Sequence, residues 1–151
     1  MLIGKKENFA IEFEINGDFI NFKLFLNNIQ IGCDDDESYL GTHLHIQKLL
    51  DADVCTNLEL TNFNILYYTE NFFDESVFPL SQWLDLGEGF DDFYIKFIKK
   101  ELSYIFVWKL DDEACFDYKN YSYEVQAYEV HRDIVEKTIT SFIEEARRNI
   151  Q

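Results

Sequence analysis

Residues 9–26 alternate apolar and polar side chains with a period of two, and the alternation is interrupted at Asn16-Gly17. A period of two is typical of half-buried β-strands. Asn-Gly is a favoured type I′ hairpin turn, and Asn27-Asn28 offers a second turn because asparagine tolerates positive φ. The sequence therefore predicts a three-stranded antiparallel meander over residues 8–32. Its inward-facing positions are Phe9, Ile11, Phe13, Ile15, Ile20, Phe22, Leu24 and Leu26.

The last 19 residues carry an apolar stripe at helical spacing, which predicts a long C-terminal helix that covers a sheet. Asp133 followed by Glu136 resembles a capping box, and Arg147 and Arg148 suit the negative end of the helix dipole. The stripe consists of Val135, Ile139, Phe142, Ile143, Ala146 and Ile150.

The middle of the chain gives a mixed pattern. Residues 38–53 show a moderate helical pattern, for which Asp36 or Ser38 is a candidate N-cap. "NLELTNFNILYYTENFF" (57–73) fits a short strand followed by a helix, or a helix throughout. Residues 79–92 suggest a short helix or turn stopped by the glycines at 87 and 89.

Two further strands and a hairpin follow. Residues 92–98 alternate, "SYIFVWKL" (103–110) is apolar on both faces as a central strand should be, and the polar residues 99–101 between them form the turn. Residues 121–130 form another strand, whose change of parity predicts a bulge near Ala127. Together these elements predict one α+β domain over residues 1–151, with a mostly antiparallel sheet of about six strands packed with two to four helices.

The N-terminus and the cysteines suggest a cytoplasmic protein. "MLIGKKENFAIEFEI" lacks the basic, apolar and small-residue regions of a signal peptide, and no run of 18 apolar residues exists to span a membrane. The three cysteines at 33, 55 and 115 show no C-x-x-C spacing, so we expect buried or half-buried free thiols rather than disulfides or a zinc site.

Charge is distributed unevenly along the chain. The net charge is −16, and the last 21 residues carry four basic and four acidic side chains, so the whole excess lies in residues 1–130. A negative field of this size repels nucleic acid and anionic membrane and accelerates encounter with basic proteins. We therefore expect neither nucleic acid nor a membrane as a partner.

Motifs for catalysis or cofactor binding are missing from the sequence. An EF-hand loop from Asp34 would need glycine where Tyr39 stands and glutamate where His45 stands, and the run 111–113 fails in the same way. His43 and His45 are two residues apart, which on a helix points them to different faces. There is no P-loop, G-x-G-x-x-G or G-x-S-x-G. We predict a protein without catalytic residues, metal or cofactor.

Acidic residues instead gather with aromatic ones in the irregular segments. Rings supply buried anchors for a protein partner, and carboxylates steer and pair with Lys and Arg. A plainer interpretation is that acidic loops keep an aromatic-rich domain soluble. A further such segment, 70–75, places Glu70, Asp74 and Glu75 beside Phe72 and Phe73. The predicted partner-binding residues are Asp34, Asp35, Asp36, Glu37, Asp85, Glu88, Asp91, Asp92, Asp111, Asp112 and Glu113.

The opening "IGKKENFAIEFEI", followed after a hairpin by "IGCDDDESYL", resembles the bacterial polymorphic-toxin immunity proteins of the immunity protein 42 type. The resemblance covers roughly residues 2–50 together with the strand-then-helix ending. It implies a cytoplasmic, non-enzymatic protein of a contact-dependent inhibition system, which binds the C-terminal domain of a delivered toxin and blocks it. An acidic inhibitor suits a basic toxin such as a nuclease, because its carboxylates take the place of the nucleic acid backbone.

Two alternatives remain open at this point. One is a small metal-dependent hydrolase that uses the Asp clusters. The other is an acidic nucleic-acid mimic that inhibits a host enzyme. The sequence names neither the toxin nor the oligomeric state.

Overall fold

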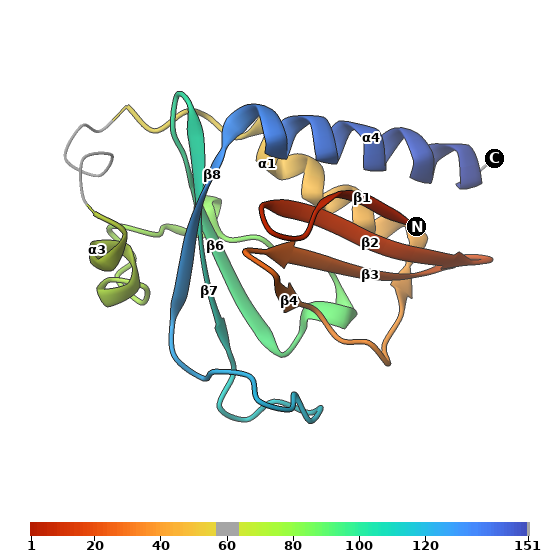
Figure 1. Cartoon of the computed structure of the whole chain (residues 1–151), viewed down its shortest axis with the longest axis horizontal. Coiled ribbons are helices and arrows are strands. Elements are labelled where there is room, and N and C mark those ends of the chain that lie inside the picture. Colours follow the sequence, from red (N-terminus) through yellow and green to blue (C-terminus); the bar gives the residue numbers. More distant parts are fainter. Residues whose placement is uncertain (57–63, 151) are drawn as a thin grey trace.

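A computed structural model describes residues 1–56 and 64–150, and within them it confirms the α+β class and the long C-terminal helix (Figure 1). These residues form eight strands in two antiparallel sheets rather than in one sheet of about six. The strands are β1 (Leu2–Lys5), β2 (Phe9–Asn16), β3 (Phe19–Leu26), β4 (Ile29–Ile31), β5 (Ser38–Tyr39), β6 (Phe93–Lys99), β7 (Ser103–Leu110) and β8 (Gln126–His131). The helical elements are η1 (Leu40–Gln47), α1 (Lys48–Asp51), α3 (Ile65–Glu70), η2 (Leu80–Gln82), η3 (Glu88–Phe90) and α4 (Arg132–Ile150).

The N-terminal sheet, β1–β5, contains the predicted meander. Strands β2, β3 and β4 are consecutive and antiparallel; β1 is added at the β2 edge, and β5 pairs with β3. The type I′ turn predicted at Asn16-Gly17 is wrong by one residue. Asn16 pairs with Phe19, so the loop is Gly17-Asp18, and positive φ occurs at Gly17 (63°) alone of the two, as in a type II′ turn.

The second turn of the meander forms as expected. Leu26 pairs with Ile29, which leaves Asn27 and Asn28 as the loop, with φ of 51° and 63°. Positive φ at both central residues defines the type I′ turn, whose twist matches that of the flanking strands.

The C-terminal sheet, β6–β8, has the apolar strand β7 in its centre, as predicted. The bulge predicted near Ala127 is wrong, because β8 pairs with β7 without interruption from Gln126 to His131. The change of parity has another cause: residues 121–125 precede the strand and do not belong to its alternation.

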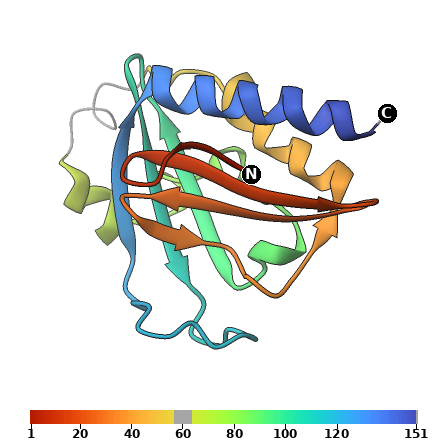
Figure 2. The same cartoon turned by 45° about the vertical axis from the view of Figure 1, so that its right-hand side comes forward.

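Helix α4 lies across both sheets, against β1 and β2 of one and β7 and β8 of the other (Figure 2). The described members of its predicted stripe, from Val135 to Ala146, are all buried. The predicted capping box is wrong: Nδ1 of His131 accepts a hydrogen bond from the Asp133 backbone N–H, while Glu136 binds the Arg132 guanidinium. Arg147 and Arg148 occupy the last turn as expected.

The segment that follows the acidic run departs from the predicted helix over 38–53. Residues 38–39 form β5, η1 is a 3-10 helix, and only Lys48–Asp51 are α-helical. Neither predicted N-cap acts as one, because η1 follows Tyr39 without a side-chain cap. Ser38 instead pairs with Ile20 of β3, so strand pairing overrides helix initiation here.

Buried side chains form two clusters, one on each face of the C-terminal sheet. The larger lies between the two sheets and under α4, and it includes Phe9, Phe106 and Phe142. The smaller lies on the outer face of β6 and β7, where Tyr68, Phe72 and Phe78 cover Ile98 and Ile105. The segment 64–84 is therefore a second layer on the C-terminal sheet.

Residues 57–63 of the "NLELTNFNILYYTENFF" prediction lie outside the described residues; residues 65–70 are helical, and Glu88–Phe90 form a short 3-10 helix near the predicted glycine stop. The three cysteines are free; Cys33 is buried and Cys55 half-buried as expected, whereas Cys115 is exposed. Among the helices of the described residues, none has the length and apolar character needed to cross a membrane.

Candidate protein-binding surface

Two of the three predicted acidic runs meet in space. The backbone N–H of Cys33 donates to the carbonyl of Gly89 at 2.8 Å, and the N–H of Gly89 donates to Oγ of Ser38 at 3.3 Å. A hollow of about 150 Å³ between them is lined in part by Asp36, Glu88 and Asp91. We call this region the acidic surface. Its members are Asp34, Asp35, Asp36, Glu37, Asp85, Glu88 and Asp91.

A glycine allows the two runs to approach. Gly87 has φ of 98°, and a Cβ there would lie 2.9 Å from Oγ of Ser38. Any other residue would be strained and would separate η3 from β5. The glycine that looked like a helix stop in the sequence therefore closes the acidic surface.

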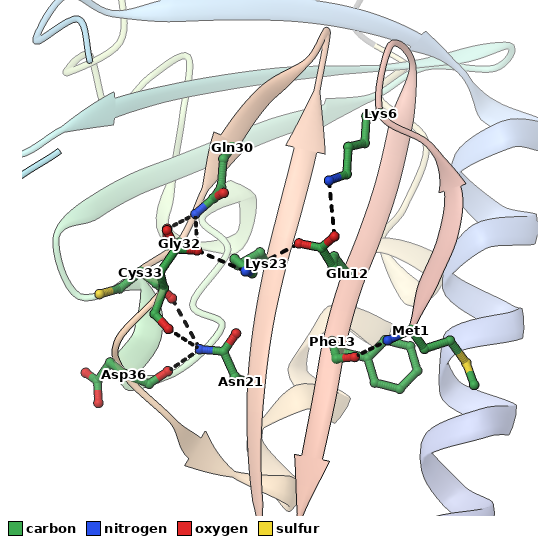
Figure 3. A network of polar contacts seen from close by, with 11 residues as sticks. Met1, Lys6, Glu12, Phe13, Asn21, Lys23, Gln30, Gly32, Cys33 and Asp36 are labelled. Atoms are coloured by element: carbon green, nitrogen blue, oxygen red, sulfur yellow. Dashed lines mark hydrogen bonds and ion pairs between the residues drawn. The ribbon is translucent and has the colours of Figure 1, made fainter. Parts of the chain in front are cut away.

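The backbone of the run 34–37 is fixed by Asn21 of β3 (Figure 3). Nδ2 of Asn21 donates to the carbonyl oxygens of Cys33, Asp34 and Asp36, at 3.4, 3.0 and 2.8 Å. The helix cap expected from the sequence does not form. The run is a loop held against the open face of the N-terminal sheet.

Lys23 neutralises one member of the run. Its Nζ lies 2.9 Å from Oδ1 of Asp34 and 3.3 Å from Oε2 of Glu12. The hydrogen bond from Lys23 holds the pKa of Asp34 below its ordinary value, and the hydrogen bond from Lys6 does the same for the pKa of Glu12. Within the described residues, the other six carboxylates of the acidic surface form no ion pair.

Asp91 shows the effect of this uncompensated charge. Partial burial, and then the nearby carboxylates of Asp85 and Glu88, raise the pKa of Asp91 above its ordinary value. A Lys or Arg brought to this position by a partner would relieve that repulsion.

Asp92 has a different place from its neighbour. It is buried, and its carboxylate accepts hydrogen bonds from the N–H groups of Cys115 and Phe116 and from the Tyr118 hydroxyl, at 2.8, 3.2 and 3.0 Å. It ties the loop 111–120 to the start of β6. Asp92 therefore has a structural role and is not part of the acidic surface.

The third acidic run, 111–113, adjoins the surface through an aromatic residue. Oδ2 of Asp111 accepts a hydrogen bond from the Tyr94 hydroxyl at 3.0 Å, and Asp112 pairs with Lys109 at 3.0 Å. Tyr94 in turn lines a depression of about 220 Å³ together with Trp83, Asp85 and Asp91. Asp111 and Asp85 thus flank the same group of rings.

The acidic residues could be identified from the sequence, but the residues that position them could not. Asn21, Lys23 and Tyr94 belong to the outward side of regular strands, where the alternation marks only solvent exposure. The role of Lys23 could have been predicted, because the register of the meander places this lysine opposite Glu12, where a cross-strand ion pair is expected. The described residues contain no group of three or more His, Cys, Asp or Glu side chains arranged to hold a metal ion.

Comparison with solved structures identifies the fold of this chain. No protein-family model matches the chain, and neither does any curated protein sequence. Among solved structures, CdiI from Burkholderia dolosa AUO158 is similar with a TM-score of 0.63 over 96% of this chain and 99% of that chain, at 16% sequence identity. The chain therefore has the fold of a contact-dependent inhibition immunity protein, which confirms at the level of the fold the resemblance found in the sequence.

Proposed function

We propose that this protein is an immunity protein that binds a cognate bacterial toxin domain and neutralises it by covering it, without catalysis of its own. The observation that carries the proposal is the similarity to CdiI, which extends over nearly the full length of both chains. The resemblance of residues 2–50 to immunity proteins points the same way.

The charge of the acidic surface favours a basic partner. The six carboxylates that form no ion pair lie on backbone segments held in place by hydrogen bonds, so little backbone conformational entropy is lost when a partner binds them. Rigid charges of one sign increase the rate of encounter with a surface of the opposite sign. A nuclease is a partner of this kind, because it must hold phosphate groups. The protein would act in the cytoplasm, where such a toxin is active.

Co-expression tests the proposal directly. The toxin domain to use is the variable C-terminal end of a large secreted protein encoded next to this chain's gene. Cells that express the domain alone should stop growing, and co-expression of this protein should restore growth. The purified pair should bind tightly, with an association rate that falls as salt rises.

A matched control separates the acidic surface from net charge. The double variant Asp85→Lys, Glu88→Lys should lose protection, whereas Glu101→Lys, Glu144→Lys, which makes the same charge change at exposed positions elsewhere, should keep it. Growth arrest that this protein does not relieve, with no complex in vitro, would refute the proposed function. Equal protection by both variants would refute the acidic surface alone.

A further inference from the structure

A buried lysine lies at the centre of an aromatic cage on the outer face of the C-terminal sheet. Lys96 of β6 is 3% exposed, and its ammonium lies 4.2 Å from the ring centroid of Phe72, 5.2 Å from that of Phe73 and 4.4 Å from that of Trp83. It also donates a hydrogen bond to the carbonyl of Phe72. Within the described residues no carboxylate pairs with Lys96, and burial lowers its pKa.

The cage is only half covered. Phe73 is 67% exposed and Trp83 is 37% exposed, although both rings contact the same buried ammonium. Tyr94, which is 39% exposed, lies two residues before Lys96 on the same strand and so on the same face of the sheet. We call Phe73, Trp83 and Tyr94 the aromatic ridge.

Trp83 is held firmly at the centre of this surface. The indole N–H of Trp83 donates to the carbonyl of Phe78, and Trp83 forms a β-bridge with Lys96. The ammonium of Lys48 donates to the carbonyl oxygens of Leu80 and Trp83. Trp and Tyr, together with Arg, are the residues enriched among those that dominate binding energy in protein interfaces.

The ridge is continuous with the acidic surface. Trp83 and Tyr94 line the depression that Asp85 and Asp91 also line, and the hydroxyl of Tyr94 contacts Asp111. We propose that the aromatic ridge holds an apolar side chain of the toxin, and that Lys or Arg residues flanking this side chain pair with Asp85, Asp91 and Asp111. This inference rests on the proposed function for the identity of the partner, and it specifies the partner's chemistry.

The charge of Lys96 decides between an apolar and a cationic side chain on the ridge. A cation is attracted to an aromatic face within about 6 Å of the centroid. Here Lys96 already occupies the inner side of Phe73 and Trp83, so a second cation on the outer side would be repelled through the thin ring. An apolar side chain has no such penalty.

A second copy of this chain is the weaker candidate for the ridge. Glu70, Asp74 and Glu75 lie close in sequence to Phe73 and are exposed, and Asp85 and Asp91 flank the other end. Two such surfaces placed face to face would bring like charges together in a chain that already carries −16.

Kinetics with the toxin domain provide the first test. The double variant Phe73→Ala, Tyr94→Ala should raise the dissociation rate of the complex about tenfold or more, with the association rate and its salt dependence little changed. Leu102→Ala, which removes a 70% exposed leucine from the β6–β7 turn, is the matched control and should change neither rate. An unchanged dissociation rate in the ridge variant, with tight binding by the wild type, overturns the inference and leaves the proposed function intact.

A second test does not need the toxin. The probes are three capped peptides: Lys-Lys-Leu-Lys-Lys and two analogues in which serine or arginine replaces the central leucine. Each peptide is titrated at low salt while the indole N–H resonance of Trp83 is followed by NMR. The leucine peptide should bind several-fold more tightly than either analogue and shift this resonance. Equal binding by all three, or preference for arginine, overturns the inference whatever the toxin experiment gives.

The role of the buried charge is tested by Lys96→Met, which keeps the volume of the side chain. The arginine peptide should gain affinity for this variant relative to the wild type, while the leucine peptide should not. An unchanged preference in a variant whose NMR spectrum shows a folded sheet would remove Lys96 from the explanation. If the variant does not fold, the wild-type comparison of the three peptides still decides the inference.

Discussion

Asp34 and Asp91 belong to the same acidic surface, yet their surroundings shift their pKa values in opposite directions. Asp34 accepts hydrogen bonds from Lys23 and Gln30, at 2.9 and 3.0 Å, and its pKa falls below the ordinary value. Asp91 forms no ion pair within the described residues, and its partial burial together with the neighbouring carboxylates raises its pKa. The first charge is already used by the fold, whereas the second is uncompensated.

This difference shows how one surface divides its charges between structure and binding. The loop 33–37 is held by hydrogen bonds from Asn21 and Lys23, and the negative charge of Asp34 is therefore already paired within the fold. The segment 85–91 is fixed by backbone contacts, by Gly87 and by the Asp85 carboxylate, which accepts a hydrogen bond from the Gly87 N–H at 3.1 Å. Within the described residues the carboxylates of Glu88 and Asp91 form no ion pair. In the function we propose, Asp85, Glu88 and Asp91 provide most of the steering, and Asp34 provides little.

The largest expected effect separates Asp92 from its neighbour Asp91. Asp92→Asn should lower the free energy of unfolding by roughly 3 kcal/mol, because two partly buried N–H groups and the Tyr118 hydroxyl lose a buried, charged acceptor. Asp91→Asn, the matched control one residue away, should not destabilise the protein. Urea denaturation of both variants measures the difference. A loss below about 1 kcal/mol for Asp92→Asn would contradict the structural role given to this residue.

The next effect concerns association with the toxin domain. Asp85→Lys, Asp91→Lys should slow association at low salt by about tenfold or more, whereas Asp34→Lys, per charge, should slow it less. Lys23 loses one of its two carboxylate partners when Asp34 is replaced and then repels a basic partner more strongly, so a modest effect is still expected there. Stopped-flow measurements over a range of salt concentrations test this, and equal slowing per charge at the two sites would contradict the division proposed above.

The sequence was sufficient for elements whose signal is local. Period-two alternation located β2, β3 and β6, and the apolar stripe located α4, because each pattern directly reflects which side chains are buried. The failures had both distant and local causes. Ser38 pairs with the distant Ile20 instead of starting a helix, whereas the box expected at α4 is replaced locally by the His131 side chain, two residues before Asp133.

The candidate site was only partly accessible to sequence reasoning, because its geometry depends on contacts between segments distant in the sequence. The carboxylates could be identified because runs of like charge are visible in one dimension. Their meeting at Ser38 and Gly89 depends on two segments 51 residues apart, and the burial of Asp92 depends on the loop 115–118. The cation within the aromatic cage was hidden because Lys96 occupies an outward position of an alternating strand, where lysine is ordinarily exposed.

A smaller effect tests the support of the 33–37 loop. Asn21→Ala should destabilise the protein by about 1 kcal/mol, because the carbonyl oxygens of Asp34 and Asp36 lose their shared donor and remain partly solvated. Hydrogen exchange should quicken at residues 33–37 and stay unchanged in η3. Asn149→Ala removes a hydrogen bond that a side-chain amide donates to a backbone carbonyl at the exposed end of α4, and it should leave the loop 33–37 unaffected. Protection of 33–37 that survives Asn21→Ala would show that Lys23 and Gln30 suffice to hold the loop.

The smallest effect is a difference in sign between Asp34→Asn and Asp91→Asn. At neutral pH the first should cost a few tenths of a kcal/mol, since its ion pair is largely exposed, and the second should stabilise by a similar amount through relief of repulsion. Asp34, whose pKa is lowered from 3.8, contributes stability that is present above pH 3.8 and is lost as pH falls below it.

Asp91 should behave in the opposite way as the pH falls. Its pKa is raised from 3.8, so its charge penalises the folded state at neutral pH, and the penalty disappears as pH falls through the raised pKa towards 3.8. The stability advantage of Asp91→Asn over the wild type should therefore shrink as the pH falls through the raised pKa of Asp91. The stability deficit of Asp34→Asn should persist until the pH falls below 3.8. Denaturation curves between pH 7 and 3 for both variants measure these differences. Parallel pH profiles would mean that the two carboxylates are equivalent, and the division of the acidic surface into structural and binding charges would fail.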